Sequence, residues 1–277
     1  MATQYASNID AETVADFGKE WASFDQTKLS HAELHQQFGC YFSLFDFENA
    51  GEGFDLGCGS GRWAQLVAPR VRRLHCIDPA TDALAVARKT LSGHANVVLH
   101  HGCADTIPLP DNSQDFGYSL GVLHHVPDPE AAMRNAVRKL KPGAQFLVYL
   151  YYRFDNRPAW FRGLWRVSDI IRKGVCRLPF PVKKALTSIV AATVYYPLAR
   201  SALLLEKAGC NVESFPLSPY RVRSFYSMRT DALDRFGTRL EHRFTQAEIR
   251  AMMERCGLTG IRFSEGPPCW VAHGIKP

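Results

Sequence analysis

The chain has 277 residues, 46% of them hydrophobic and 22% charged, with a formal net charge of +6 and eight cysteines. These proportions describe a soluble globular protein with a sizeable core, at a length that one enlarged domain can reach. The start of the chain lacks the basic and apolar segments of a secretory signal, and no two cysteines have C-x-x-C spacing. We therefore expect a cytoplasmic protein with reduced thiols, and neither a disulfide framework nor a zinc site.

Residues 1–50 are predicted to form a helical cap ahead of a sheet. Val14, Phe17 and Trp21 recur at the spacing of one helix face, and apolar side chains continue at similar intervals through residues 28–50. Asp10 or Thr13 is a suitable residue to start the first helix.

Closely spaced glycines follow, between a predicted strand at 53–57 and a helical pattern that begins at once. Glycines in such a turn let the backbone approach a ligand tightly, because no Cβ stands in the way. The residues predicted to hold that ligand are Asp55, Gly57, Cys58, Gly59, Ser60 and Gly61.

An acid closes the next predicted strand, 72–77. Asp78 lies 23 positions after Asp55, about where a nucleotide-type ligand presents its ribose hydroxyls. Asp78 followed by Pro79 is also a helix-capping pattern, which is compatible with ribose binding. A dinucleotide fingerprint would need a third glycine at position 62, where the chain has Arg62. An adenosine-containing cofactor is therefore predicted, and a nicotinamide oxidoreductase stays as the alternative.

Strand and helix patterns then alternate, which predicts a parallel sheet covered on both faces. The further strands are expected at 96–100, 115–121 and 144–151, and the helices at 62–69, 81–92 and 128–140. After Tyr152 the alternation lapses, and residues 157–210 look helical. Residues 153–229 carry fourteen Lys and Arg against four Asp and Glu.

The final part of the chain is predicted to complete the sheet. Residues 215–243 look loop-rich, and a helix from Thr245 to Cys256 opens with a capping box completed by Glu248. Two strands follow at 259–265 and 269–275.

The D-x-G-x-G-x-G turn, Asp78 and the later segments together resemble the class I S-adenosylmethionine (SAM) dependent methyltransferases, in particular the small-molecule group. Phe17-Gly18-Lys19-Glu20-Trp21 resembles a motif of a subset often linked to cell-envelope and polysaccharide pathways. The resemblance implies an α/β, Rossmann-like, seven-stranded mostly parallel sheet with an antiparallel C-terminal hairpin. The expected parts are a cap at 1–50, a SAM-binding core at 51–152, a helical insertion after strand five at 153–229, and the completed sheet at 230–277.

The resemblance also implies roles for residues after the third strand. Gly102 to Asp105 matches the segment at the adenine edge, where the family usually has an acid and this chain has Cys103. Either Asp105 replaces that acid, or a backbone carbonyl does, or the adenine is held less tightly. Ala104 and Leu120 are expected to contact the adenine.

Ser119 to Asp128 resembles the motif that faces the transferred methyl group. Methyl transfer depends on holding the nucleophile in line, and needs a general base only if the acceptor loses a proton. His125 is the expected catalytic base. His124, Tyr226 and His242 are the expected acceptor-side residues, and no metal is expected.

The function implied is transfer of a methyl group from SAM to oxygen, carbon or nitrogen of a small-molecule or lipid- or glycan-linked acceptor, with a SAM-binding scaffold without turnover as a further alternative. For the basic insertion three interpretations remain open: a lid for a bulky or lipid-linked acceptor with peripheral membrane contact, a surface for RNA or an acidic carrier protein, or ordinary solvent-facing residues. Nucleic acid is disfavoured because the methyl-facing motif lacks an N-P-P-Y-type sequence. In 186–205, Pro197 and Arg200 interrupt a potential membrane span, which predicts two packed helices.

Overall fold

A computed structural model of the chain describes residues 8–24, 30–266 and 270–277. The described residues form two compact units. The sheet unit contains the N-terminal segment together with residues 37–153 and 240–277, and the helical unit contains residues 154–239 with the short segment before residue 37. The two units are described separately.

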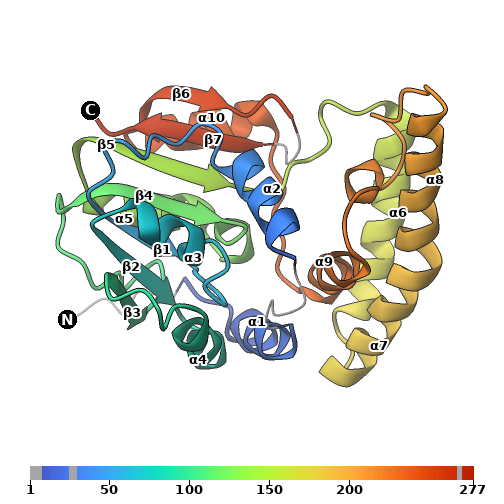
Figure 1. Ribbon diagram of the computed structural model, residues 1–277, viewed down its shortest axis with the longest axis horizontal. Helices are drawn as coiled ribbons and strands as arrows, with labels where there is room; N and C mark the ends of the chain where they lie inside the picture. Colours follow the sequence, from blue (N-terminus) through green and yellow to red (C-terminus); the bar gives the residue numbers. More distant parts are fainter. Residues whose placement is uncertain (1–7, 25–29, 267–269) are drawn as a thin grey trace. The chain divides into compact units, whose positions relative to one another are not determined.

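The sheet unit contains a seven-stranded sheet of order β3-β2-β1-β4-β5-β7-β6 (Figure 1). Its strands are β1 Glu52–Leu56, β2 Arg73–Asp78, β3 Val97–His101, β4 Gln114–Leu120, β5 Leu140–Tyr149, β6 Thr259–Phe263 and β7 Val271–Ile275. The first five are parallel, and β7 runs antiparallel to both β5 and β6. The predicted α/β fold with an antiparallel C-terminal hairpin is therefore confirmed.

The strand order reverses at β1, which lies between β2 and β4. In open parallel sheets, ligands bind outside the carboxyl ends of the strands at such a switch point. The glycine turn follows β1 directly, so the fold itself brings this turn to the expected binding position.

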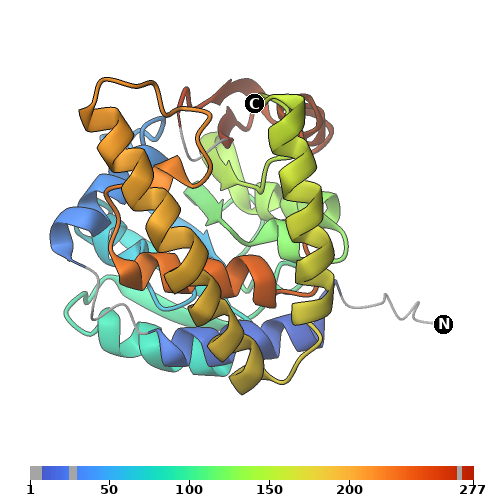
Figure 2. The same ribbon diagram turned by 90° about the vertical axis from the view of Figure 1, so that its right-hand side faces the viewer.

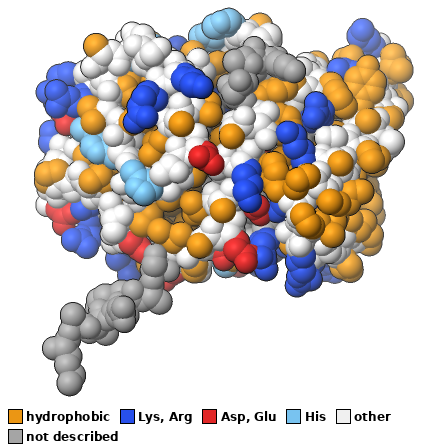
Figure 3. Space-filling view, turned by 90° about the horizontal axis from the view of Figure 1, so that it is seen from below, with side chains coloured by type: hydrophobic (Ala, Val, Ile, Leu, Met, Phe, Trp, Pro, Cys, Tyr) orange, Lys and Arg blue, Asp and Glu red, His pale blue; other side chains and the backbone are white. Residues whose placement is uncertain are grey.

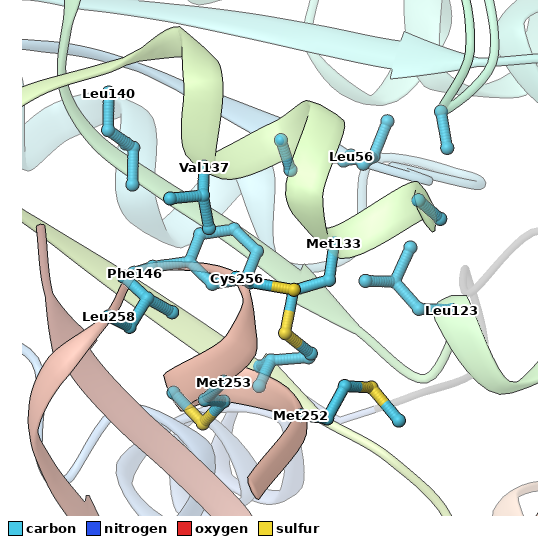
Figure 4. Close-up of a cluster of buried hydrophobic side chains, with 14 of the residues drawn as sticks. Leu56, Leu123, Met133, Val137, Leu140, Phe146, Met252, Met253, Cys256 and Leu258 are labelled. Carbon is cyan, nitrogen blue, oxygen red and sulfur yellow. The ribbon is translucent and has the colours of Figure 1, made fainter. Parts of the chain in front are cut away.

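Apolar side chains cover both faces of the sheet. The helices of this unit are α1 Ala11–Ser23, α3 Ala64–Val67, α4 Thr81–Thr90, α5 Pro129–Lys139 and α10 Gln246–Arg255, with the latter part of α2 His31–Tyr41. On one face, Met133 of α5 and Met253 of α10 belong to the same buried cluster as Phe146 of β5 (Figure 4). On the other face, Phe38 of α2 belongs to a second cluster with Tyr118 of β4.

The helix termini follow the predicted capping chemistry. Asp128 caps α5 by accepting from the Ala131 amide at 3.0 Å, and Thr245 and Glu248 form the complete capping box of α10. The helix predicted at 128–140 ends at Lys139, and β5 begins at Leu140, four residues earlier than predicted. The extra length pairs Leu140 with Gln114 across an irregularity in the β4–β5 ladder.

The helical unit contains α6 Ala159–Val175, α7 Phe180–Val190, the π-helical turn η3 Ala191–Tyr195, α8 Tyr196–Lys207, the 3₁₀ turn η4 Ser218–Tyr220 and α9 Phe225–Gly237 (Figure 2). Helices α7 and α8 join through η3 into one helical run from Phe180 to Lys207. The prediction of two separate helices was therefore wrong. Pro197 is tolerated because it stands in the first turn of α8, just after the π-helical turn.

The loop-rich prediction for 215–243 was also wrong, because α9 lies within it. Ser224 caps this helix by accepting from the Ser227 amide, and Met228, Ala232 and Phe236 bury one face at four-residue spacing. Charged residues between them weakened the helical pattern in the sequence. The insertion boundary expected at 229 falls inside α9.

Candidate functional site

The glycine turn needs glycine at two positions for different steric reasons. Gly57 and Gly59 have φ angles of +82° and +53°. A Cβ on Gly57 would lie 2.4 Å from a methyl group of Val122, and one on Gly59 would lie 3.0 Å from the Trp21 indole nitrogen. The turn therefore fits tightly between the segment after β4 and helix α1.

The amides of this turn are used within the protein. The Gly57 and Cys58 amides donate to the Ile77 carbonyl at 2.8 and 3.1 Å, and the Gly59 amide donates to Asp78 Oδ2 at 2.9 Å. They hold the turn against the end of β2. Each of these three amides thus has an acceptor within the protein. The Ser60 hydroxyl is buried without a hydrogen-bond partner in the described part of the chain.

Asp78 connects the glycine turn to the start of α4. Its Oδ1 accepts from the Ala80 amide at 2.8 Å, so both carboxylate oxygens receive backbone N–H groups. Burial raises the pKa of Asp78 to about 6 despite these bonds. Burial also raises the pKa of the nearby Asp55 to about 8, and the negative charge of Asp78 contributes to that rise. Asp55 is therefore mostly protonated near pH 7, and Asp78 supplies the negative charge beside the turn that favours a positively charged ligand.

A cavity of about 520 Å³ lies beside Pro79 and Ala80, the residues that follow Asp78, and its volume is within the usual range of small-molecule sites. Three segments contribute to its wall: α1 with the residues before it, the turn after β2, and the turn after β3. The lining residues are Ile9, Ala11, Val14, Ala15, Gly18, Lys19, Pro79, Ala80, Thr81, Asp82, His101, Gly102, Cys103 and Thr106.

The residues predicted for the adenine edge lie in different environments in the structure. Cys103 lines the cavity and contacts the Thr106 hydroxyl, with Sγ and Oγ1 3.3 Å apart. Asp105 is exposed, and its Oδ2 accepts from the Asn8 amide at 2.5 Å. Ala104 and Leu120 are buried in the two core clusters.

Helix α1 extends along the site, from the cavity to the residues after β4. Val14 and Gly18 line the cavity, Trp21 lies against Gly59, and the Phe17 ring centroid is 5.0 Å from that of His125. The sequence pointed to Phe17 and Trp21 through the apolar face of this helix and the motif that they share. It missed the cavity-lining side chains of α1, because Ala15 and Gly18 carry no chemical signal of their own.

His125 lies in the 3₁₀ turn η2 Leu123–His125 that follows β4. Its ring is buried, and Nδ1 is 2.7 Å from the Leu240 carbonyl oxygen. A carbonyl only accepts, so Nδ1 carries the hydrogen and the neutral ring has its lone pair on Nε2. This is the tautomer that a general base requires.

His124 has a different environment from its neighbour. Its side chain is fully buried and stacks on Tyr151 at 3.8 Å between ring centroids, and neither ring nitrogen has a hydrogen-bond partner among the described residues. Burial, helped by His125, Arg243 and His242, holds the pKa of His124 well below 6.5. It therefore stays neutral at physiological pH.

Of the expected acceptor-side residues, His242 is close to the histidine pair: its amide donates to the His124 carbonyl at 2.9 Å. Tyr226 belongs to α9 of the helical unit. Sequence reasoning missed Arg243, whose guanidinium pairs with Glu241 at 2.7 Å and lies 5.0 Å from the Tyr151 ring centroid. The sequence signal that could have pointed to Arg243 is the run of three consecutive titratable residues, Glu241, His242 and Arg243.

Comparison with known proteins agrees with this geometry. Residues 54–148 match the family model described as "Methyltransferase domain". An uncharacterized methyltransferase of Mycobacterium bovis is 30% identical over 186 residues, which are 65% of this chain and 70% of that protein. The chain belongs to the class I SAM-dependent methyltransferases. This decides against the nicotinamide alternative.

Two further proteins resemble the chain, one in sequence and one in fold. The ubiquinone/menaquinone biosynthesis C-methyltransferase of Rubrivivax gelatinosus is 32% identical over 161 residues, 56% of this chain and 61% of that enzyme. A SAM-dependent methyltransferase of Thermotoga maritima shares the fold, with a TM-score of 0.50, 18% identity, and coverage of 96% of this chain and 98% of that one. This chain thus spans less than two thirds of the Rubrivivax enzyme's length.

The site fits SAM, which is the cofactor of this class. The carboxyl groups of Asp55 and Asp78 are buried beside the glycine turn, and the cavity that begins after Asp78 is large enough for an adenine ring. Arg62, which replaces the third glycine of a dinucleotide fingerprint, hydrogen-bonds Gln37 Oε1 and stacks 4.5 Å from the Trp63 ring centroid.

Proposed function

We propose that the chain methylates an oxygen, carbon or nitrogen atom of a small-molecule or lipid- or glycan-linked acceptor, with His125 as the general base where the acceptor must lose a proton. The observation that carries this proposal is the hydrogen bond between His125 Nδ1 and the Leu240 carbonyl. It leaves Nε2 as the proton acceptor, and it stabilises the imidazolium that forms when the proton arrives.

Asp78 is proposed to hold the ribose hydroxyls, while Pro79 and Cys103 contact the adenine from the cavity wall. Bound SAM supplies an activated methyl group on a positively charged sulfur. The carboxylate of Asp78 offsets the positive charge of that ligand, and the neutral His124 adds no opposing charge.

An aromatic acceptor is favoured by the side chains near the proposed base. Phe17, His124 and Tyr151 lie within 5.5 Å of His125 between ring centroids. Flat rings pack well against such a group of aromatic side chains. The Rubrivivax relative is named for ubiquinone and menaquinone biosynthesis, which supports the same acceptor class.

Two measurements on the whole protein test the proposal. Calorimetry should detect binding of SAM and S-adenosylhomocysteine and no binding of NADH. Incubation with SAM and fractionated lipid-soluble and water-soluble extracts should release S-adenosylhomocysteine with one fraction. Binding without release from any fraction would identify a scaffold without turnover.

Replacing His125 by Ala should lower turnover about 10²- to 10⁴-fold, because a positioned general base contributes that much. SAM affinity should stay unchanged, since His125 is proposed to act on the acceptor. His94→Ala, in the connection between α4 and β3, is the matched control. Turnover by His125→Ala equal to that of the control across pH 6 to 9 would remove the base assignment.

A further inference from the structure

Helix α6 presents an apolar stripe to solvent. Trp160, Leu164, Val167 and Ile171 recur at intervals of four, three and four residues, which places them on one helix face. Each is more than half exposed, and the adjacent Ile170 is 70% exposed. Isolated exposed apolar residues are ordinary, but a continuous stripe of this size marks an interaction surface.

The run from Phe180 to Lys207 has one buried and one exposed face. Its buried residues are Lys183, Thr187, Ala191, Tyr195, Ala199 and Ala202. The first five recur every four positions, and two of them are polar. Ala191, Tyr195 and Ala199 pack on Met228 and Phe236 of α9. The opposite face exposes Val182, Leu186, Ile189, Val194, Tyr196 and Leu204.

The two apolar faces belong to the same side of the helical unit. Figure 2 shows α6 and the α7–α8 run in front of α9, which crosses behind both. The view in Figure 3 shows hydrophobic side chains gathered over these helices, with Lys and Arg side chains among them. We call the exposed apolar residues of α6 to α8 the outer face.

Basic residues border the outer face. Arg162, Arg166, Lys173 and Arg177 follow the α6 stripe along one side at intervals of four, seven and four residues. Residues 154–239 contain fifteen Lys and Arg against six Asp and Glu. Several of the acids pair with arginines within the unit, as Asp169 does with Arg172 and Glu206 with Arg221.

We propose that the outer face binds an anionic lipid bilayer at its surface, with the apolar stripes among the acyl chains and the bordering basic residues at the headgroups. Apolar residues flanked by Lys and Arg are the composition of helices that lie in a membrane interface. A second copy of this chain is a poorer occupant, because its helical unit carries the same excess of positive charge.

The outer face lies on the membrane and does not cross it. The run from Phe180 to Lys207 has the length and hydropathy of a membrane span. Its buried face, however, packs against α9. Lys183 Nζ donates to the Gly237 carbonyl at 3.2 Å. Surrounding this helix with lipid would break that bond and expose Lys183 to hydrocarbon.

Flotation of the full chain with vesicles tests the proposal. Vesicles of phosphatidylcholine and phosphatidylglycerol at about 7:3 should carry the protein, and pure phosphatidylcholine should carry far less. The double variant Leu164→Glu/Ile170→Glu should lose at least about tenfold in vesicle partitioning. For Arg166→Glu/Lys173→Glu, partitioning to anionic vesicles should fall about fivefold for each substituted residue. Added salt should reduce the binding of the wild type to these vesicles.

Val222→Glu is the matched control, because Val222 is 55% exposed in the same unit and lies outside α6 to α8. It should bind vesicles like the wild type, and every variant should retain its SAM affinity. Equal binding of the wild type to neutral and anionic vesicles would overturn the proposal. Protein that stays in the vesicles after an alkaline carbonate wash would also overturn it, because such resistance indicates a membrane span. A third outcome would assign the outer face to self-association instead. In that outcome the wild type does not bind vesicles but forms concentration-dependent dimers, and the Leu164→Glu/Ile170→Glu variant does not form them.

Discussion

At the residue scale, Asp78 is the most connected side chain of the site. Its two oxygens accept from the amides of Gly59 and Ala80, so one carboxylate fixes the glycine turn and the start of α4 together. The ribose interaction is proposed to use the remaining lone pairs of the same oxygens.

Replacing Asp78 by Ala should weaken SAM binding by about 1.5–3 kcal/mol, the range for hydrogen bonds to a charged group. The loss should appear in calorimetry with SAM and with S-adenosylhomocysteine alike. Asp111→Ala, an exposed carboxylate paired with Arg138 and Lys139, should leave the affinity unchanged. An Asp78→Ala affinity equal to that of the wild type would remove the ribose assignment.

The raised pKa of Asp78 predicts a pH dependence of SAM affinity. The pKa is about 6 in the protein without ligand, so the carboxyl group takes up a proton as the pH falls below 6 and loses its negative charge. The dissociation constant for SAM should therefore rise between pH 7 and pH 5, by up to about tenfold per pH unit below the pKa. Asp78→Asn should bind more weakly at pH 7 and show a flat profile over this range. A flat wild-type profile would contradict the prediction.

At the scale of elements, α1 is the helix that most defines the cavity. Val14, Ala15 and Gly18 line it, and a Cβ on Gly18 would be in ordinary van der Waals contact with Ala80 and Asp82 at 3.6 Å. Small side chains on this face leave the space that the ligand is proposed to fill.

Ala15→Trp should fill part of this cavity and weaken SAM binding at least tenfold, because a large ring would occupy a cavity of about 520 Å³. Ala22→Trp adds the same side chain at an exposed position of the same helix that does not line the cavity. Calorimetry should show the loss for position 15 alone, with similar melting temperatures for both variants. Equal affinities would show that adenosine binds elsewhere.

The strands and termini of the sheet unit could be predicted from the sequence because each has a local chemical cause. Asp128 before Pro129 starts α5, and Thr245 with Glu248 starts α10. By contrast, α9 depends on burial of Met228 and Phe236 against the α7–α8 run. Such tertiary burial leaves little trace in the local pattern when charged residues stand between the apolar ones.

At the scale of the whole molecule, stability should depend on pH through buried histidines. His273 of β7 is 2% exposed, and burial lowers its pKa to about 4. Between pH 4 and 6.5 the unfolded chain binds more protons at this residue than the folded chain does, so the free energy of unfolding falls as the pH falls. The loss from His273 amounts to about 3 kcal/mol by pH 4.

His273→Gln should reduce this loss, since glutamine does not titrate and can still donate to Gln145, whose Oε1 is 3.3 Å from His273 Nε2. Urea unfolding at pH 7 and at pH 4.5 measures both proteins. The difference in the free energy of unfolding between the wild type and His273→Gln should narrow or reverse at pH 4.5. The other titrating groups contribute equally to both proteins, so they cancel in this difference. A difference that stays constant with pH would contradict the assigned pKa.

The glycine turn, Asp78 and the histidine pair could be predicted from the sequence, because glycine, carboxylate and imidazole residues at these spacings are typical of ligand-binding and proton-transfer sites. The sequence could not show that the turn's amides are already engaged by Ile77 and Asp78. It also could not show that Leu240, 115 residues away in the chain, contacts His125. Contacts of that kind arise only once distant segments fold together.

Leu240 is the first residue after the helical unit, whose last residue is Arg239. Its carbonyl decides which nitrogen of His125 carries the hydrogen. A force that pulled the chain at residue 239 would lengthen this bond and let the imidazole proton exchange between its two nitrogens. If His125 is the base that we propose, proton transfer from the acceptor would then respond to any force on the inserted helices, because the chain is continuous from Arg239 to Leu240.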